Sequence, residues 1–213
     1  MLRKVFWDDP YLTELESHIA GVDGDRVNLS ETIFFAFSGG QESDTGRIGG
    51  YPVLDARTHE SDIIYTLPEA HGFAPGDAVR VEIDWPRRFR LMRLHFAAEI
   101  VLELVYRHLP GIRKIGAHIA EDKARLDFSL DENISRHFDM LAGDANGIIE
   151  NDMPIESAFS DVAAGRRYWK IDGFGQVPCG GTHLKRTGEV GKISLKRKNI
   201  GGGKERIEVY LSD

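Results

Sequence analysis

The chain changes character at Asp84-Trp85-Pro86, and this change limits the possible folds more than any other feature of the sequence. Before it, short apolar runs alternate with Gly, Pro and Asp. After it, residues 88–108 contain neither Gly nor Pro and are rich in Leu, Ala, Met, Arg and Glu, which favour a helix. We therefore predict an N-terminal β domain over residues 1–87 and a second domain over residues 88–213.

The first domain is expected to be built from short strands. Residues 32–37 are β-branched and aromatic, and they end at Ser38-Gly39-Gly40. Similar runs follow at residues 48–54, 63–67 and 78–83, with Gly, Pro or Asp between them. Such spacing suits a small antiparallel β-barrel.

The second domain is expected to mix helices and strands, which makes the whole chain α+β. Pro110-Gly111 ends the long helix, and Asp131 is a candidate N-cap for a second helix that reaches about Leu141. Four strand-like runs accompany these helices, at residues 112–119, 124–130, 193–198 and 206–211. The last two flank Gly201-Gly202-Gly203 and predict a β-hairpin.

Composition favours a cytoplasmic protein without a membrane anchor. No apolar run reaches the roughly 18 to 20 residues that a membrane span needs, and the N-terminus lacks the basic and apolar blocks of a secretory signal. A single cysteine, Cys179, cannot form an internal disulfide. The formal net charge of −7 argues against a protein that coats nucleic acid in general.

Two pairs of residues are candidate metal ligands. His95 and Glu99 are four residues apart in the predicted helix, so their side chains share one face and can reach one ion. Cys179 and His183 are joined by Gly180-Gly181-Thr182, which permits a tight turn. The second pair alone is also compatible with a buried Cys and a solvated His. Together, nitrogen, sulfur and carboxylate ligands suit zinc, and an open fourth position would hold a water for hydrolysis.

Other segments offer polar or basic groups. The loop from Ser38 to Gly46 carries backbone NH groups and Gln41, and is read either as a phosphate-binding loop or as a hairpin turn. Residues 184–209 hold eight basic against three acidic side chains, a local charge of +5. A second basic cluster opens the long helix. Such clusters suit an RNA backbone or a solvated face.

Several sequence blocks resemble the alanyl-tRNA editing proteins called AlaX, relatives of the editing domains of alanyl- and threonyl-tRNA synthetases. The blocks follow the family's order over nearly the whole chain, and they are Ser38-Gly39-Gly40-Gln41 to Asp44-Thr45-Gly46, Asp84-Trp85 with Arg87, Arg88, Met92, Arg93 and His95, Pro178 to His183 with Thr187 to Gly191, and Gly203-Lys204 with Arg206-Ile207-Glu208. The resemblance implies an N-terminal β-barrel followed by a two-layer α/β editing domain, common to threonyl- and alanyl-tRNA synthetases, with one zinc ion.

Carried to this chain, the family's zinc ligands become His95, Cys179 and His183. The family's second helical His is replaced by Glu99, which would lower the net charge of the site and weaken zinc as a Lewis acid. Glu99 then has three possible roles: a fourth ligand, a general base acting on metal-bound water, or a mark of a site that no longer binds metal.

The resemblance implies ATP-independent hydrolysis, in trans, of the ester in serine-charged tRNA(Ala), with Glu99, Gln41 and Thr182 assisting catalysis. The acceptor stem would bind basic residues, namely Arg87, Arg88, Arg93, Lys196, Lys198, Lys204 and Arg206. Two alternatives remain: a non-catalytic tRNA-binding relative with an altered metal site, and a deacylase of different amino-acid specificity. No stable protein partner is expected.

Overall fold

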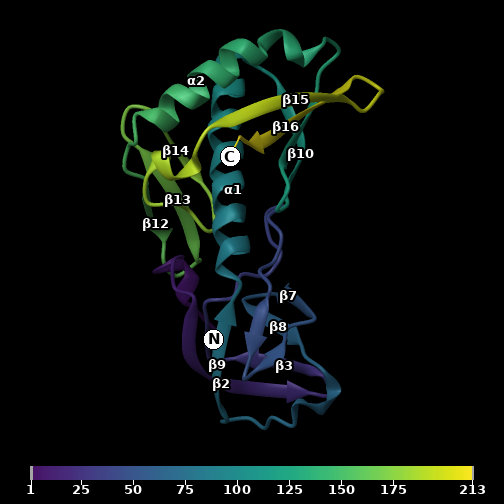
Figure 1. The fold of residues 1–213 in the computed structure, drawn as a ribbon, viewed down its shortest axis with the longest axis vertical. Coiled ribbons are helices and arrows are strands. Elements are labelled where there is room, and N and C mark those ends of the chain that lie inside the picture. Colours follow the sequence, from purple (N-terminus) through teal and green to yellow (C-terminus); the bar gives the residue numbers. More distant parts are fainter. Residues whose placement is uncertain (1, 213) are drawn as a thin grey trace. The chain divides into compact units, whose positions relative to one another are not determined.

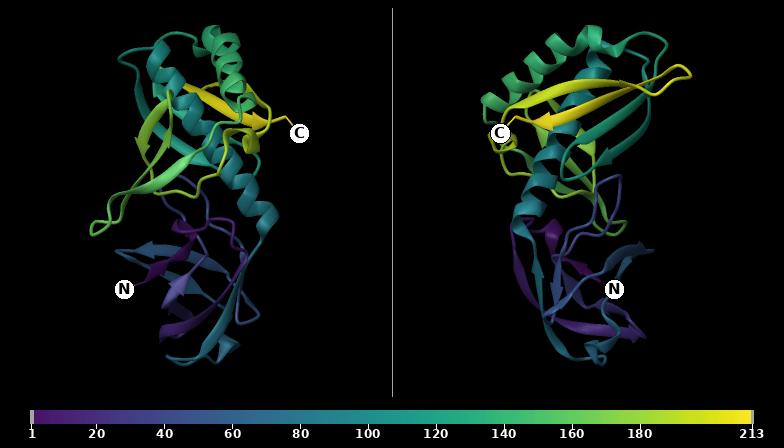
Figure 2. Two further views of the ribbon diagram at one scale, coloured as in Figure 1. Left: turned by 90° about the vertical axis from the view of Figure 1, so that its left-hand side faces the viewer. Right: turned by 45° about the vertical axis from the view of Figure 1, so that its right-hand side comes forward.

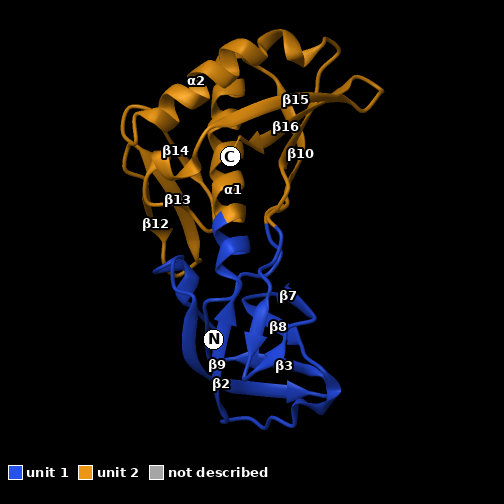
Figure 3. Cartoon of the chain, in the orientation of Figure 1, with its two compact units in different colours: residues 1–38, 42–89 blue, residues 39–41, 90–213 orange. Residues whose placement is uncertain are grey.

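The computed structural model describes residues 2–212, and the chain forms two compact units (Figure 3). Unit 1 comprises residues 1–38 and 42–89, and unit 2 comprises residues 39–41 and 90–213. The domain boundary after residue 87 stays a prediction, because a compact unit is not by itself a domain that folds independently. None of the helices in residues 2–212 has the length and hydrophobicity needed to cross a lipid bilayer.

Unit 1 is built on a seven-stranded sheet with the order β6-β5-β9-β2-β3-β8-β7. The strands are β2 (Glu14–Asp23), β3 (Arg26–Leu29), β5 (Gly46–Ile48), β6 (Tyr51–Pro52), β7 (Asp55–His59), β8 (Asp62–Thr66) and β9 (Ala78–Ile83). Two short strands, β1 (Arg3–Lys4) and β4 (Glu31–Thr32), pair in parallel, and two 3-10 turns, η1 (Val5–Trp7) and η2 (Glu69–His71), complete the unit. Within residues 2–212 no ladder joins the edge strands β6 and β7, so closure into a barrel stays a prediction.

The strands expected at residues 63–67 and 78–83 are confirmed as β8 and β9. The expected strand at residues 32–37 is wrong, because the regular strand ends at Thr32. Beyond it the backbone NH of Phe35 donates to Asp44 Oδ2 at 2.7 Å, and that of Phe37 donates to Ser43 Oγ at 2.8 Å. Side chains of the following loop therefore satisfy these NH groups in place of a neighbouring strand.

The long helix α1 (Trp85–His108) begins three residues before the predicted start. Asp84 Oδ1 accepts from the backbone NH of Arg87 at 3.2 Å, which caps the helix. Pro86 fits the first turn because its missing NH has no partner there in any helix. From Leu91 to Val105 most apolar side chains of α1 are buried, on all sides of the helix, as expected of a helix inside a core.

Unit 2 packs two helices and two sheets (Figures 1 and 2). One sheet has the order β10-β11-β16-β15, with β10 (Arg113–Ile119), β11 (Ala124–Ser129), β16 (Lys204–Leu211) and β15 (Ile193–Asn199). The other has the order β12-β13-β14, with β12 (Glu156–Asp161), β13 (Arg166–Ile171) and β14 (Gly175–Pro178). The remaining elements are η3 (Ile134–His137), α2 (Phe138–Glu150) and η4 (Thr187–Val190).

The two strand pairs predicted in this unit are confirmed, including the hairpin of β15 and β16 around three glycines with positive φ. The prediction for the second helix is wrong at both ends. The Asn133 side chain, not Asp131, caps the segment by accepting from the NH of Ser135, and a 3-10 turn precedes the α-helix, which continues to Glu150. The chain is thus a mixed α and β protein in which strands predominate.

Candidate functional site

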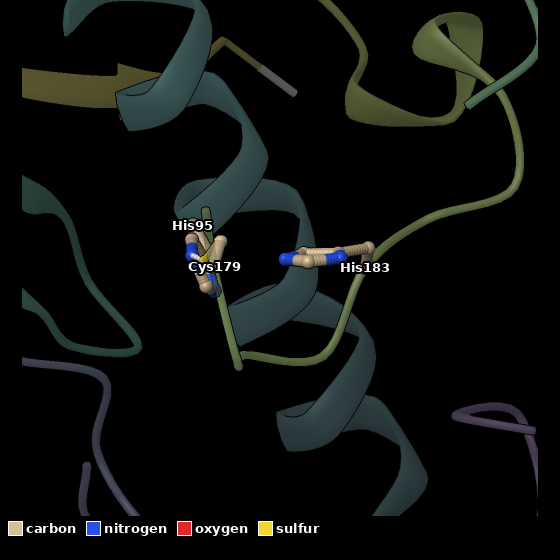
Figure 4. A group of neighbouring side chains, drawn as sticks. All are labelled: His95, Cys179 and His183. Carbon is tan, nitrogen blue, oxygen red and sulfur yellow. Dashed lines mark hydrogen bonds between the residues drawn. The ribbon is translucent and has the colours of Figure 1, made fainter. Parts of the chain in front are cut away.

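A cluster of three side chains in unit 2 brings together ligand atoms from distant parts of the sequence. His95 lies on α1, Cys179 follows β14 directly, and His183 lies in the loop after it (Figure 4). One ligand atom from each residue lies within 4.8 Å of the others. Within the trio, Cys179 Sγ and His95 Nε2 are 3.3 Å apart. The three predicted zinc ligands therefore converge.

A hydrogen bond at Nδ1 orients each of the two imidazole rings. Gln41 Oε1 lies 2.6 Å from His95 Nδ1, and Ser157 Oγ lies 2.9 Å from His183 Nδ1. Each ring can donate through Nδ1 and keep the lone pair of Nε2 for another partner. His183 Nε2 is buried and makes no hydrogen bond within residues 2–212. A buried acceptor without a partner is costly, and a metal ion would satisfy it.

The Gln41 side chain is itself held by Thr182. Its Nε2 atom donates to Thr182 Oγ1 at 3.0 Å, and the two residues are 1% and 0% exposed. The backbone NH of Ile119 donates to Gly40 O at 2.7 Å, which fixes the start of the loop. The predicted catalytic roles of Gln41 and Thr182 stay predictions. Their contacts show that Thr182 holds the Gln41 side chain and that Gln41 in turn positions the His95 ring.

The loop that carries Cys179 and His183 approaches α1 closely. The NH of Cys179 donates to Arg167 O at 2.9 Å, which places the sulfur at the end of β14. A Cβ atom on Gly181 would lie 2.0 Å from His95 Cε1. Only glycine therefore fits at position 181 with the ring in this place.

Glu99 lies one helical turn after His95 and faces two of the three ligands. Its Oε1 atom is 3.4 Å from His95 Nε2 and 3.8 Å from Cys179 Sγ. Its Oε2 atom accepts from Trp169 Nε1 at 3.0 Å. One carboxylate oxygen is thus held by the indole, and the other lies in the cluster.

Charge in the metal-free cluster is strongly shifted. Burial disfavours a charged His95, but Cys179 and Glu99 beside it outweigh burial and raise its pKa to about 10. Burial also disfavours the Glu99 carboxylate, yet His95 and Trp169 lower its pKa. Burial, His95 and Arg167 push the pKa of His183 well below its ordinary value, so this imidazole is neutral. A neutral His183 is ready to bind a metal ion.

The predicted tRNA-binding residues lie in different environments. Arg88 is fully buried in unit 1, where its guanidinium binds both Asp44 carboxylate oxygens and donates to Ile33 O at 2.6 Å. Arg88 is thus not accessible to a phosphate. Arg87 contacts Glu42 and Ser43 O, and Arg93 donates to Val190 O at 2.9 Å.

The remaining predicted tRNA contacts lie on the hairpin of β15 and β16. Lys196, Lys198 and Lys204 are exposed there, whereas Arg206 is half-buried in an ion pair with Asp127. The sequence did not point to Ser157 or Trp169, which orient His183 and Glu99. Neither lies in a motif with recognisable spacing, and only the pairing of β12, β13 and β14 brings them to the cluster.

Similarity to known proteins first indicates the class of protein to which the chain belongs. Residues 170–208, which include Cys179 and His183, match the family described as Threonyl and Alanyl tRNA synthetase second additional domain. This segment of unit 2 thus resembles a domain that occurs in these synthetases. An Alanine--tRNA ligase of Methanococcus maripaludis is 31% identical over 96% of this chain, although the match spans 25% of that ligase.

Shorter relatives match from end to end. The Alanyl-tRNA editing protein AlaX-M of Pyrococcus horikoshii is 33% identical over 99% of this chain and 98% of its own length. The protein of the same name from Methanosarcina acetivorans is 30% identical over the whole of both chains. The chain belongs to the AlaX family of alanyl-tRNA editing proteins, as its sequence blocks predicted.

Proposed function

We propose that this protein is a trans-acting deacylase that hydrolyses the ester bond of mischarged tRNA(Ala), with serine-charged tRNA(Ala) as its substrate and one zinc ion per chain as its cofactor. The observation that carries the proposal is the convergence of His95, Cys179 and His183, with His183 Nε2 buried and without a hydrogen bond. The names of the full-length relatives supply the substrate class.

The donor set fits zinc. Two imidazole nitrogens and one sulfur are ligands that zinc accepts, and with bonds of roughly 2.0–2.3 Å the ligand atoms of a tetrahedral site lie about 3.5 Å apart. The separation of 3.3 Å between Cys179 and His95 agrees with this value. The longest separation in the trio, up to 4.8 Å, means that the ligands would close slightly on the ion. Bound zinc would polarise the ester carbonyl and make a bound water more acidic.

The protein's own groups would prepare this site. Gln41 and Ser157 hold the imidazoles with Nε2 directed to the cluster. Glu99 Oε1 lies 3.4 Å from His95 Nε2 and 3.8 Å from Cys179 Sγ, although the cluster within 4.8 Å comprises His95, Cys179 and His183. The lowered pKa of Glu99 favours a carboxylate that stabilises positive charge over one that accepts a proton. We therefore rank Glu99 as a ligand before a general base. We also propose that unit 1 is the N-terminal barrel domain of this enzyme.

The direct test is incubation of the protein with serine-charged and with correctly charged tRNA(Ala), followed by measurement of released amino acid. We expect selective release of serine, and we expect Cys179→Ala to abolish both zinc content and release. Lys170→Ala, a change at a half-exposed position on β13, is the matched control. Tight tRNA binding without release would instead support a non-catalytic relative.

A deacylase with another amino-acid preference is the second candidate, and Glu99 is the observation that favours it. A carboxylate beside the sulfur and imidazole adds negative charge where the substrate would lie. A panel of mischarged tRNAs decides between the two. Faster release of an amino acid other than serine, with a shift back toward serine in Glu99→His, would support the second candidate.

A further inference from the structure

The sheet β10-β11-β16-β15 has one apolar face and one polar face. Leu126, Phe128, Ile207 and Val209 are at most 2% exposed and belong to the core of unit 2. Residues that lie directly opposite one another in neighbouring strands share a face. The alternate positions therefore form cross-strand rows on the polar face, and Figure 2 shows the strands that carry them beside α1.

Two rows on the polar face contain most of its charge. In the first, Lys198 lies opposite Arg206, which lies opposite Asp127. In the second, Lys196 lies opposite Glu208, followed by Arg125 and His118. Cations therefore occur on three of the four strands, β11, β16 and β15, and on β10 the two rows end at Gly116 and His118.

Both sheet carboxylates on this face already have cationic partners. Asp127 forms a two-point pair with Arg206, at 2.6 and 2.9 Å. Glu208 accepts from Lys123 Nζ and from Tyr210 OH, both at 2.9 Å. Among residues 2–212, Arg125, Lys196 and Lys198 have no ion pair, and Lys196 lies over the Tyr210 ring at 4.8 Å. The face therefore has uncompensated positive charge.

Arg125, on β11, lies among these cations and lines a hollow in the polar face. Its Nε atom is buried and makes no hydrogen bond in the described part of the chain. It lines a hollow of about 330 Å³ together with Lys198, Arg206, Lys123 and His118, and the acidic side chains there are Asp122 and Glu208. A buried Nε–H donor without an acceptor is costly, and an anion entering the hollow would remove that cost.

We propose that this polar face binds the phosphates of an RNA backbone, with Arg125 and Lys198 as its central contacts. The free cations extend over strands about 4.8 Å apart, and Lys196 and Lys198 are about 7 Å apart along β15. This spread suits a polyanion with successive phosphates better than one small anion. The inference rests on the proposed function for the choice of RNA, and it adds Arg125 to the contacts expected from sequence.

The test is binding of unacylated tRNA(Ala), which requires no hydrolysis. We expect Arg125→Ala with Lys198→Ala to weaken binding on the order of tenfold, and to reduce the slope of log affinity against log salt by about two. Arg125→Lys with Lys198→Arg preserves charge and should retain most of the affinity. Arg136→Ala with Lys170→Ala removes the same charge from an exposed and a half-exposed position outside this sheet and should leave both quantities unchanged. Far-UV circular dichroism checks that each variant folds.

Wild-type affinity and salt slope in the Arg125 and Lys198 variant would overturn this proposal, and so would an equal loss in the control pair. The result is separable from that of the proposed function. If wild type releases serine selectively and the variant binds tRNA normally, the proposed enzymatic function stands and the proposed RNA-binding surface is wrong. If the variant binds tRNA weakly and wild type releases no amino acid, the proposed RNA-binding surface stands and the proposed enzymatic function is wrong.

Discussion

Gln41 acts on the cluster through His95. It accepts from His95 through one amide atom and donates to Thr182 through the other, so a single side chain fixes the orientation of the imidazole. Contacts of this kind also set which ring nitrogen is left for a metal ion. These contacts show that Gln41 positions His95, and the catalytic role predicted from the sequence stays a prediction.

Removing this contact should weaken metal binding without removing a ligand. We expect Gln41→Ala to reduce zinc affinity about 10- to 100-fold, because outer-shell partners of a metal-binding histidine have effects of this size. Competition with a zinc chelator measures it. Thr182→Val removes only the outer hydrogen bond and should have a smaller effect. Equal affinity in wild type and Gln41→Ala would show that His95 needs no such support.

Zinc binding should depend on pH through His95. Burial opposes its charge, but Cys179 and Glu99 raise its pKa to about 10, so in the metal-free protein this imidazole holds a proton at neutral pH. A metal ion must displace that proton. Apparent affinity should therefore rise by about one log unit per pH unit between roughly pH 7 and 9. Calorimetry in buffers of different ionisation enthalpy measures the proton released, and affinity independent of pH would contradict this account.

At the scale of elements, the loop after β14 works only if it passes close to α1. A methyl group on Gly181 would collide with the His95 ring, whereas a Cβ on the neighbouring Gly180 has no other atom within 4 Å. We expect Gly181→Ala to lose most bound zinc and Gly180→Ala to retain it. Metal analysis of the two purified variants measures the difference. Full zinc content in Gly181→Ala would mean that loop and helix adjust easily.

The start of α1 is fastened inside unit 1 by a buried ion pair. Arg88 and Asp44 have side chains that are 0% exposed, and Arg88 also donates to Pro10 O and Ile33 O. Loss of one partner leaves an uncompensated buried charge. We expect Arg88→Ala to lower the free energy of unfolding by about 3–5 kcal/mol, measured by urea denaturation. Arg87→Ala, at a partly exposed pair with Glu42, should cost no more than about 1 kcal/mol.

The sequence predicted those elements whose pattern is local. The strands β8, β9, β10, β11 and the β15–β16 hairpin follow from alternating apolar runs between turn residues. It did not predict β2, β3 or the β12-β13-β14 sheet, whose strands carry many charged and polar residues on an exposed face. The same limit applied to the site. The candidate ligands lie at helical or turn spacing and were predicted, whereas Ser157 and Trp169 reach the cluster through strand pairing.

At the scale of the whole molecule, charge is distributed unevenly. The chain has a net charge of −7, yet the polar face of one sheet in unit 2 has cations without ion pairs. An acidic protein with one basic face can bind RNA selectively without coating nucleic acid in general. This charge distribution agrees with the proposed binding of tRNA by a member of the AlaX family.

The measurement that tests the central claim most directly is X-ray diffraction from crystals of the zinc-loaded protein at energies above and below the zinc absorption edge. We predict one anomalous peak per chain, at about 2.0–2.3 Å from His95 Nε2, Cys179 Sγ and His183 Nε2. The same preparation should release serine from mischarged tRNA(Ala), and removal of zinc should stop the release. Absence of a peak at these atoms, together with full activity of metal-free protein, would contradict the account.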